Sequence, residues 1–141
     1  MTEEAEAHSE ANRLLEFVGL RGMGDVFARN LPYGDQRRVE MARALAMNPK
    51  ILFLDEPTVG IDAQSRNLIH EQLSALNQRG TTILYTTHYM EEAQELCSRV
   101  GIIDSGRLIQ QGAPAELLEQ SGRRNLEDLF LQLTGKQLRD A

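Results

Sequence analysis

Two adjacent carboxylates, Asp55 and Glu56, follow an uninterrupted apolar run at residues 51–54 and precede Pro57. The run predicts a strand buried on both faces of a parallel sheet, and Pro57 lacks the N–H that further pairing needs. In open α/β sheets, ligands bind at the carboxyl ends of the strands. One acid there can hold hydrated Mg²⁺ while the other orients or deprotonates an attacking water. For two acids alone, a solvated pair that ends a strand is the simpler interpretation.

A histidine, His88, ends the next predicted strand. Residues 81–87 are short and rich in β-branched side chains, which predicts a strand. Residues 63–78 carry apolar side chains at helical spacing, with Asp62 as the N-cap. A strand–helix–strand order implies a right-handed parallel crossover, so we expect His88 at the sheet edge that carries the two acids. A structural histidine bonded to a loop is the alternative.

A glycine-containing turn precedes another predicted helix, which ends at Asn48 and Pro49. Free backbone N–H groups and the helix dipole make such a turn a candidate anion site, although most turns of this kind are only turns. Three arginines, Arg37, Arg38 and Arg43, add positive charge nearby. The residues of the turn are Leu31, Pro32, Tyr33, Gly34, Asp35 and Gln36.

The remaining pattern predicts a helix that ends before Gly19, a hairpin of residues 100–104 and 107–111, and a helix opened by Pro114. A C-terminal apolar stripe is expected to dock on this domain: Leu126, Leu129, Phe130 and Leu133. We divide the chain into a helical portion (residues 1–48), an α/β core portion (49–112) and a helical tail (113–141).

Composition is that of an ordinary globular protein, with 141 residues, 41% hydrophobic and 26% charged. A net charge of −6 argues against a nucleic-acid partner held through its phosphates. The single cysteine, Cys97, excludes an internal disulfide. The acidic N-terminus has no signal-peptide character, and no apolar stretch approaches the ~20 residues that span a bilayer.

The order of these motifs resembles the second half of the nucleotide-binding domain of an ABC-type ATPase, the ATP-binding subunit of an ABC transporter. Residues 31–35 match the family's signature motif, and residues 51–56 match Walker B with its following glutamate. Residues 59–62 match the D-loop, and Thr87 with His88 matches the switch histidine. The resemblance implies an α/β, partial P-loop NTPase-like domain with a mostly parallel sheet flanked by helices.

The resemblance also implies roles for these residues. Asp55 would bind Mg²⁺ through water, Glu56 would polarise the hydrolytic water and His88 would contact the γ-phosphate. Asp62 would lie at the seam of a dimer. The signature residues would bind ATP held on a second nucleotide-binding domain: Leu31, Tyr33, Gly34, Asp35 and Gln36. A transmembrane permease would be the other partner, and the location would be cytoplasmic, on the inner face of the cell membrane.

Two departures from the family pattern stand out. The usual signature Leu-Ser-Gly-Gly-Gln is replaced by Leu-Pro-Tyr-Gly-Asp, so the serine hydroxyl is absent at Pro32. The sequence also contains no Gly-x-x-x-x-Gly-Lys-Ser/Thr loop, the Walker A cradle for the phosphates. We therefore expect a C-terminal portion of the domain, beginning within the helical subdomain and lacking the Walker A half. Such a chain would have negligible ATPase activity alone and uncovered apolar surface that promotes association.

The motifs point to two branches of the family. Residues 31–46 look like a branched-chain amino-acid importer, whereas residues 58–65, 87–93 and 125–140 look like drug, polysaccharide or lipid exporters. Export is the leading interpretation because the exporter-like portion is longer. The alternatives are import, a non-catalytic module that regulates a full subunit, and a chromosome- or repair-type ATPase, which the acidic charge disfavours.

Overall fold

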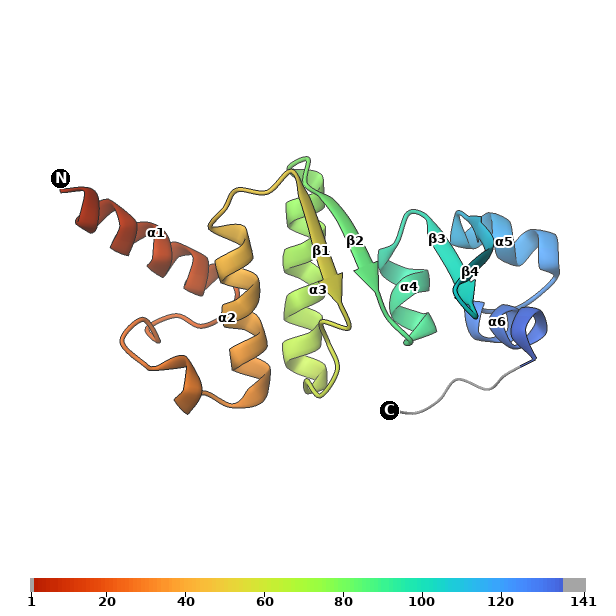
Figure 1. Cartoon of the computed structure of the whole chain (residues 1–141), viewed down its shortest axis with the longest axis horizontal. Coiled ribbons are helices and arrows are strands. Elements are labelled where there is room, and N and C mark those ends of the chain that lie inside the picture. The colour runs from red at the N-terminus through yellow and green to blue at the C-terminus, as the bar shows by residue number, and fades with distance from the viewer. Residues whose placement is uncertain (1, 136–141) are drawn as a thin grey trace. The chain divides into compact units, whose positions relative to one another are not determined.

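The computed structural model describes residues 2–135, and the chain divides into two compact units, residues 1–84 and 85–141 (Figure 1). The last residues of the exporter-like segment 125–140 lie outside the described part. None of the helices between residues 2 and 135 combines the length and apolar character needed to cross a bilayer.

The first unit contains three α-helices, a short 3₁₀ turn and the first strand. Thr2 caps the first helix, and Asp62 caps the third by accepting a hydrogen bond from the Ser65 N–H at 2.9 Å, as predicted. The second helix has Pro32 at its N-cap and no side-chain cap. The elements are α1 (Glu3–Phe17), η1 (Ala28–Asn30), α2 (Tyr33–Leu45), β1 (Ile51–Asp55) and α3 (Ala63–Gln78).

Gly19 is the point at which the three helices of this unit approach one another. It follows the C-cap of α1 with φ +77°, a conformation that favours glycine. A Cβ on Gly19 would lie 2.3 Å from Leu68 Cδ2 of α3 and 2.9 Å from an Arg38 guanidinium nitrogen of α2. Arg38 donates to the carbonyls of Val18 and Gly19 at 3.3 and 3.4 Å, which neutralises the negative end of the α1 dipole. The end of α1 is thereby tied to α2, the helix that begins at Tyr33.

Strand β1 is hydrogen-bonded to β2 (Thr82–Thr86), and the two arrows run the same way in Figure 1. The prediction that β1 is buried on both faces is wrong. Leu52 is 4% exposed, but Ile51 and Phe53 are 55% and 70% exposed. Side chains alternate along a strand, so the two exposed residues share one face. Among the described residues of this unit, only the Leu52 face is covered.

The second unit begins within β2 and is built on a hairpin. Strands β3 (Val100–Asp104) and β4 (Arg107–Gly112) pair antiparallel through a turn in which Ser105 and Gly106 have φ of 50° and 75°, which confirms the predicted hairpin. The buried core of the unit consists of Val100, Ile102, Leu117, Leu126 and Leu129. Its helices are α4 (Met90–Leu96), α5 (Pro114–Ser121) and α6 (Leu126–Thr134).

Two strand pairs therefore form the observed sheets. Within residues 2–135, β3 pairs with β4 and not with β1 or β2. The described elements make an α/β fold, as the sequence indicated. The predicted division at residues 48 and 112 stays a prediction.

Candidate functional site

The acidic pair lies at the C-terminal end of β1, where the sequence placed it. Asp55 is the last residue of the strand and is exposed, whereas Glu56 is half-buried. Glu56 has φ +47°, in the left-handed region that a non-glycine residue adopts only at a cost of ~1–2 kcal/mol. Thr58, two residues on, is 1% exposed, and its carbonyl accepts a hydrogen bond from the Ile61 N–H at 3.2 Å. Backbone strain of this kind collects at functional sites because the surrounding structure must enforce it.

Asp55 suits a magnesium ion that is bound together with phosphate. Among the residues described, no three His, Cys, Asp or Glu side chains are grouped closely enough to hold a metal ion. Mg²⁺ is commonly bound by one or two carboxylates with waters and substrate phosphates supplying the other oxygens. One exposed carboxylate at a strand end therefore fits a nucleotide-bound Mg²⁺ and does not fit a site made from protein ligands alone.

The N-terminus of α2 is the second candidate feature. Tyr33 and Gly34 are the first two residues of the helix, so no carbonyl inside the helix is available to their N–H groups. Asp35 and Gln36 N–H groups both donate to the Pro32 carbonyl at 3.0 Å. The backbone groups of Tyr33 and Gly34, together with the helix dipole, form an anion-binding arrangement.

The side chains of Asp35 and Gln36 are engaged within the chain. Asp35 forms an ion pair with Arg38, and both side chains are largely buried. Gln36 donates its amide to the Leu31 carbonyl at 2.8 Å and so closes the turn on itself. Both side chains therefore stabilise the turn, and the binding of nucleotide by residues 35 and 36 stays a prediction. An anion at this turn would therefore be bound by the backbone N–H groups of Tyr33 and Gly34.

The net positive charge near this turn is smaller than its three arginines suggest, because acidic side chains lie close to two of them. Arg37 donates to the Tyr33 hydroxyl and to Glu40, each at 2.9 Å, and its carbon Cζ lies 5.1 Å from the centroid of the Tyr33 ring. The hydrogen bond to Tyr33, followed by that to Glu40, raises the pKa of Arg37. With Arg38 paired to Asp35, two of the three predicted cationic side chains have acidic partners.

The turn before α3 packs against the signature residues. Gly60 has φ +73°, and a Cβ there would lie 3.3 Å from the Tyr33 ring. Gly34 faces the Ile61 side chain, 3.8 Å from where its own Cβ would be. Backbone hydrogen bonding from Ser65 lowers the pKa of Asp62, so this N-cap is ionised at neutral pH. The structure thus brings Tyr33 and Gly34 into contact with the segment that leads to Asp62.

His88 belongs to the second unit and follows the end of β2. It is half-buried, and its ring centroid lies 4.2 Å from that of Tyr89. Because Asp55 and Glu56 belong to the first unit, the expected meeting of the acids with this imidazole stays a prediction.

Glu92, four residues after His88, was not among the predicted site residues. It lies in the first turn of α4, where a carboxylate can complement the helix dipole while exposed, as that of its neighbour Glu91 is. It is instead 4% exposed and accepts a hydrogen bond from the Tyr85 hydroxyl at 2.7 Å. Burial, and secondarily the charge of Glu92, raises the pKa of Cys97. A glutamate four residues after a histidine was the available signal in the sequence.

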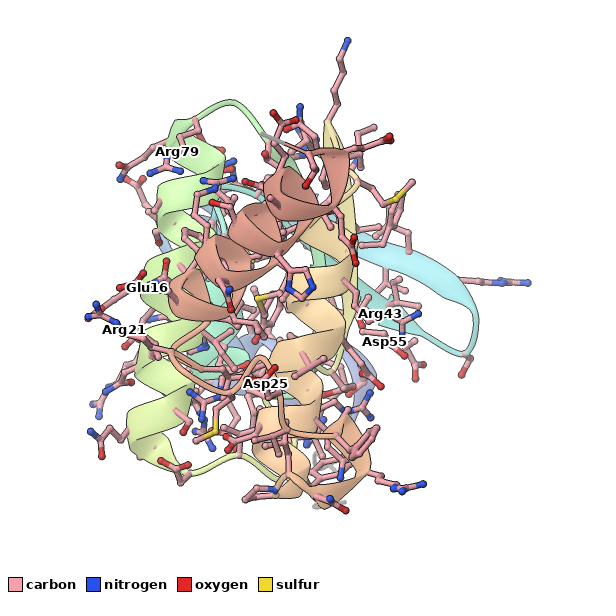
Figure 2. The ribbon with its side chains drawn as sticks, turned by 90° about the vertical axis from the view of Figure 1, so that its left-hand side faces the viewer. Glu16, Arg21, Asp25, Arg43, Asp55 and Arg79 are labelled. Atoms are coloured by element: carbon pink, nitrogen blue, oxygen red, sulfur yellow. The ribbon has the colours of Figure 1, made fainter. Side chains whose placement is uncertain are left out.

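Figure 2 shows the ribbon with its side chains as sticks and labels charged residues of the first unit. Arg43 and Asp55 lie on one flank, while Glu16 and Arg21 lie on the other. The latter two form an exposed ion pair of 3.5 Å, which contributes little to stability.

Comparison with known proteins agrees with the motif order. A family model described as ABC transporter matches residues 1–59. Nod factor export ATP-binding protein I of Burkholderia lata is 49% identical over 113 residues, which are 80% of this chain and 37% of that protein. Linearmycin resistance ATP-binding protein LnrL of Bacillus subtilis is 42% identical over 136 residues, or 96% of this chain and 42% of that protein. The chain therefore spans about two fifths of the length of these relatives.

Solved structures share the fold. The ATP-binding subunit of an ABC transporter superposes with a TM-score of 0.80 at 26% identity, covering 95% of this chain and 56% of that one. The protein cbiO1 of Clostridium perfringens, described as part of the transporter complex cbiONQ, gives a TM-score of 0.73 at 28% identity. That match covers 96% of this chain and 53% of the cbiO1 chain.

Proposed function

We propose that this chain, which belongs to the ABC transporter ATP-binding family, forms part of a subunit that hydrolyses ATP to power transport. The observation that supports this most is the packing of one unit. In the first unit, the N-terminus of α2 at Tyr33 and Gly34, which can bind a phosphate, packs against the turn that follows Asp55 and Glu56. A helix N-terminus suits the phosphates, and neighbouring carboxylates suit the metal and the water.

Each residue has a separate task in this proposal. Asp55 would hold the Mg²⁺, which when bound would neutralise charge that develops on the phosphates. Glu56 orients the attacking water and accepts its proton. The N–H groups of Tyr33 and Gly34 donate to the γ-phosphate of a nucleotide held on a second nucleotide-binding domain. His88 donates to the same phosphate and keeps it in line for attack.

The sequence supplies no Walker A loop, so its own residues do not complete a phosphate cradle. We infer that ATP acts between this chain's signature turn and a Walker A loop formed by other residues. The 141-residue chain alone is then expected to bind MgATP weakly and to hydrolyse it at background rate. Micromolar or tighter binding by the isolated chain would contradict this inference.

Export is the transport direction that the relatives support. One relative is named for Nod factor export and another for linearmycin resistance. A transmembrane permease and a second ATP-binding domain are the proposed partners, on the cytoplasmic face of the membrane. The Pro32–Tyr33 pair in the signature favours a second candidate, import of branched-chain amino acids, because it looks like that branch of the family.

A chimaera tests the proposed chemistry. The matched segment of the Burkholderia lata relative is replaced by this chain, so that the remainder of that protein accompanies it. The chimaera is expected to hydrolyse ATP, and Glu56→Gln is expected to slow single-turnover hydrolysis at least ~100-fold, as loss of a general base does. Nucleotide binding should persist because the substitution keeps the side-chain volume.

Glu71→Gln is the matched control, since Glu71 is an exposed acid on α3 in the same unit. It should leave hydrolysis within ~2-fold of the unaltered chimaera, because an exposed charge away from the site has small effects. Equal rates for Glu56→Gln and Glu71→Gln would refute the assignment of Glu56. Export of a labelled substrate from vesicles that contain the permease, compared with uptake, separates the two transport directions.

A further inference from the structure

Glu92 is a buried carboxylate to which the proposed chemistry gives no task. It lies on α4 with 4% of its surface exposed. A buried carboxylate is costly unless hydrogen bonds satisfy it. Favourable interaction with the helix dipole does not require burial, because the exposed Glu91 occupies the same first turn. The burial of Glu92 is therefore explained by the groups that its carboxylate oxygens contact.

The contacts of Glu92 are with the segment that carries His88. Its Oε2 accepts a hydrogen bond from the Tyr85 hydroxyl at 2.7 Å and another from the Thr87 hydroxyl at 3.2 Å. The Thr87 Oγ1 in turn accepts from the Tyr89 N–H at 3.0 Å. Hydrogen bonds to an ionised carboxylate are stronger than neutral ones.

These bonds bracket His88 on both sides. Thr87 precedes the histidine and Tyr89 follows it, and both belong to one chain of hydrogen bonds that ends on Glu92. Tyr89 also stacks at an angle on the His88 ring, with an interplanar angle of 38°. A change at Glu92 would reach the imidazole through Thr87 and Tyr89, both within the second unit.

We propose that Glu92 is a positioning residue that fixes the backbone of residues 87–89 and thereby the direction of the His88 imidazole. The value of this role for catalysis rests on the proposed function of His88, but the positioning itself does not. Glu92 binds the strand end through Tyr85 and the following turn through Thr87. The segment is consequently held before any phosphate arrives, which is the preorganisation that a catalytic group needs.

The test measures amide hydrogen exchange and the histidine ring signals of the 141-residue chain by NMR, without nucleotide. Glu92→Ala is expected to speed exchange of the Tyr89 amide by ~10-fold or more, the effect of losing about one net hydrogen bond. It should also shift the Cε1–Hε1 signal of His88. The Leu129 amide, which donates to Asn125 within the core of the same unit, should keep its exchange rate.

Three variants sharpen the test. Glu91→Gln removes the neighbouring exposed charge and should leave the Tyr89 amide and the His88 ring signal unchanged. Glu92→Gln retains a carbonyl oxygen as acceptor and should lie closer to the unaltered chain than Glu92→Ala does. Tyr85→Phe removes only the hydroxyl donor and keeps the ring, so it reports on the same network even if Glu92→Ala does not fold.

Two results would overturn the proposal. One is native Tyr89 exchange and an unmoved His88 signal in both Glu92→Ala and Tyr85→Phe. The other is equal acceleration of the Tyr89 and Leu129 amides, which would mean that Glu92 only stabilises the unit as a whole. The role of His88 is tested separately by His88→Ala in the chimaera. Unchanged hydrolysis there refutes the proposed function of His88 and leaves the NMR result on Glu92 standing.

Discussion

Gly19 and Gly22 form a natural pair for testing how the first unit is held together. Their φ angles are +77° and +78°, so alanine suffers the same backbone strain at both positions. Only Gly19 is crowded, because its added Cβ would lie 2.3 Å from Leu68 Cδ2, whereas nothing lies within 4 Å at Gly22. The difference between the two alanine variants therefore isolates the close approach of the helices from the cost of the conformation.

The expected magnitudes follow from these two terms. Gly22→Ala should lower the free energy of unfolding by about 1 kcal/mol, the cost of an L-residue at positive φ. Gly19→Ala adds overpacking of about 1–3 kcal/mol, for a total of about 2–4 kcal/mol. With an m-value of roughly 2 kcal/mol/M in urea, the midpoint should fall by about 0.5 M for Gly22→Ala and by about 1–2 M for Gly19→Ala.

Far-UV circular dichroism in urea measures the unfolding midpoints of both alanine variants, since the signal of the first unit comes mainly from its three α-helices. A Leu68→Ala background provides the internal control. Removing the Leu68 side chain takes away the 2.3 Å contact, so Gly19→Ala should cost about 1–2 kcal/mol less in that background. Equal losses for Gly19→Ala and Gly22→Ala would refute the idea that this contact fixes α1 against α2 and α3.

Other regions allow three further predictions. Leu126→Ala should destabilise the second unit by about 2–5 kcal/mol because Leu126 is 2% exposed, whereas Leu133→Ala on the same helix, at 38% exposure, should cost about 0.5 kcal/mol in thermal unfolding. The pKa of Asp62 is lowered on folding, so its contribution to stability is complete above its unfolded pKa and is lost as the pH falls through its folded pKa. Hydrogen exchange in α3 between about pH 5 and pH 3 should show this loss, and Asp62→Asn, which keeps a cap, should remove the pH dependence. Phe53→Lys should reduce self-association and dye binding of the isolated chain, because Phe53 is 70% exposed; unchanged sedimentation would contradict this expectation.

Local sequence signals predicted the elements well. The helix at residues 63–78 has the predicted bounds and the predicted cap at Asp62, because an apolar stripe and a capping carboxylate act over a few residues. The hairpin turn at Ser105 and Gly106 was equally local. Such features depend only on residues that are close in the sequence.

Burial was predicted less well because it depends on what covers a surface. The run at residues 51–54 looks like a strand buried on both sides, yet Ile51 and Phe53 are exposed. The hydrophobicity of these side chains indicates that burying them is favourable, but it does not indicate which segment packs against them. The contacts of the Asp35 side chain with Arg38 and of the Gln36 side chain with the Leu31 carbonyl were not predicted, since motif matching says which positions bind nucleotide and not what their side chains contact.

Glu92 is a residue whose burial the sequence did not predict. Its position after a histidine was visible in the sequence, but an acid in the first turn of a helix is commonly an exposed dipole partner. Only the fold brings the Tyr85 and Thr87 hydroxyls to its carboxylate. These side-chain hydrogen bonds join residues seven and five positions apart, and no periodic pattern in the sequence announces them.

Asp55, Glu56 and His88 are proposed to act together on one phosphate chain. The most direct measurement is a crystal structure of the chimaera carrying Glu56→Gln with MgATP bound. The account predicts a His88 imidazole nitrogen at hydrogen-bonding distance, about 2.6–3.2 Å, from an oxygen of the γ-phosphate. The substituted amide side chain at position 56 should face the same phosphate, and Asp55 should face the magnesium. A bound nucleotide with His88 directed to another surface of the protein would contradict the account.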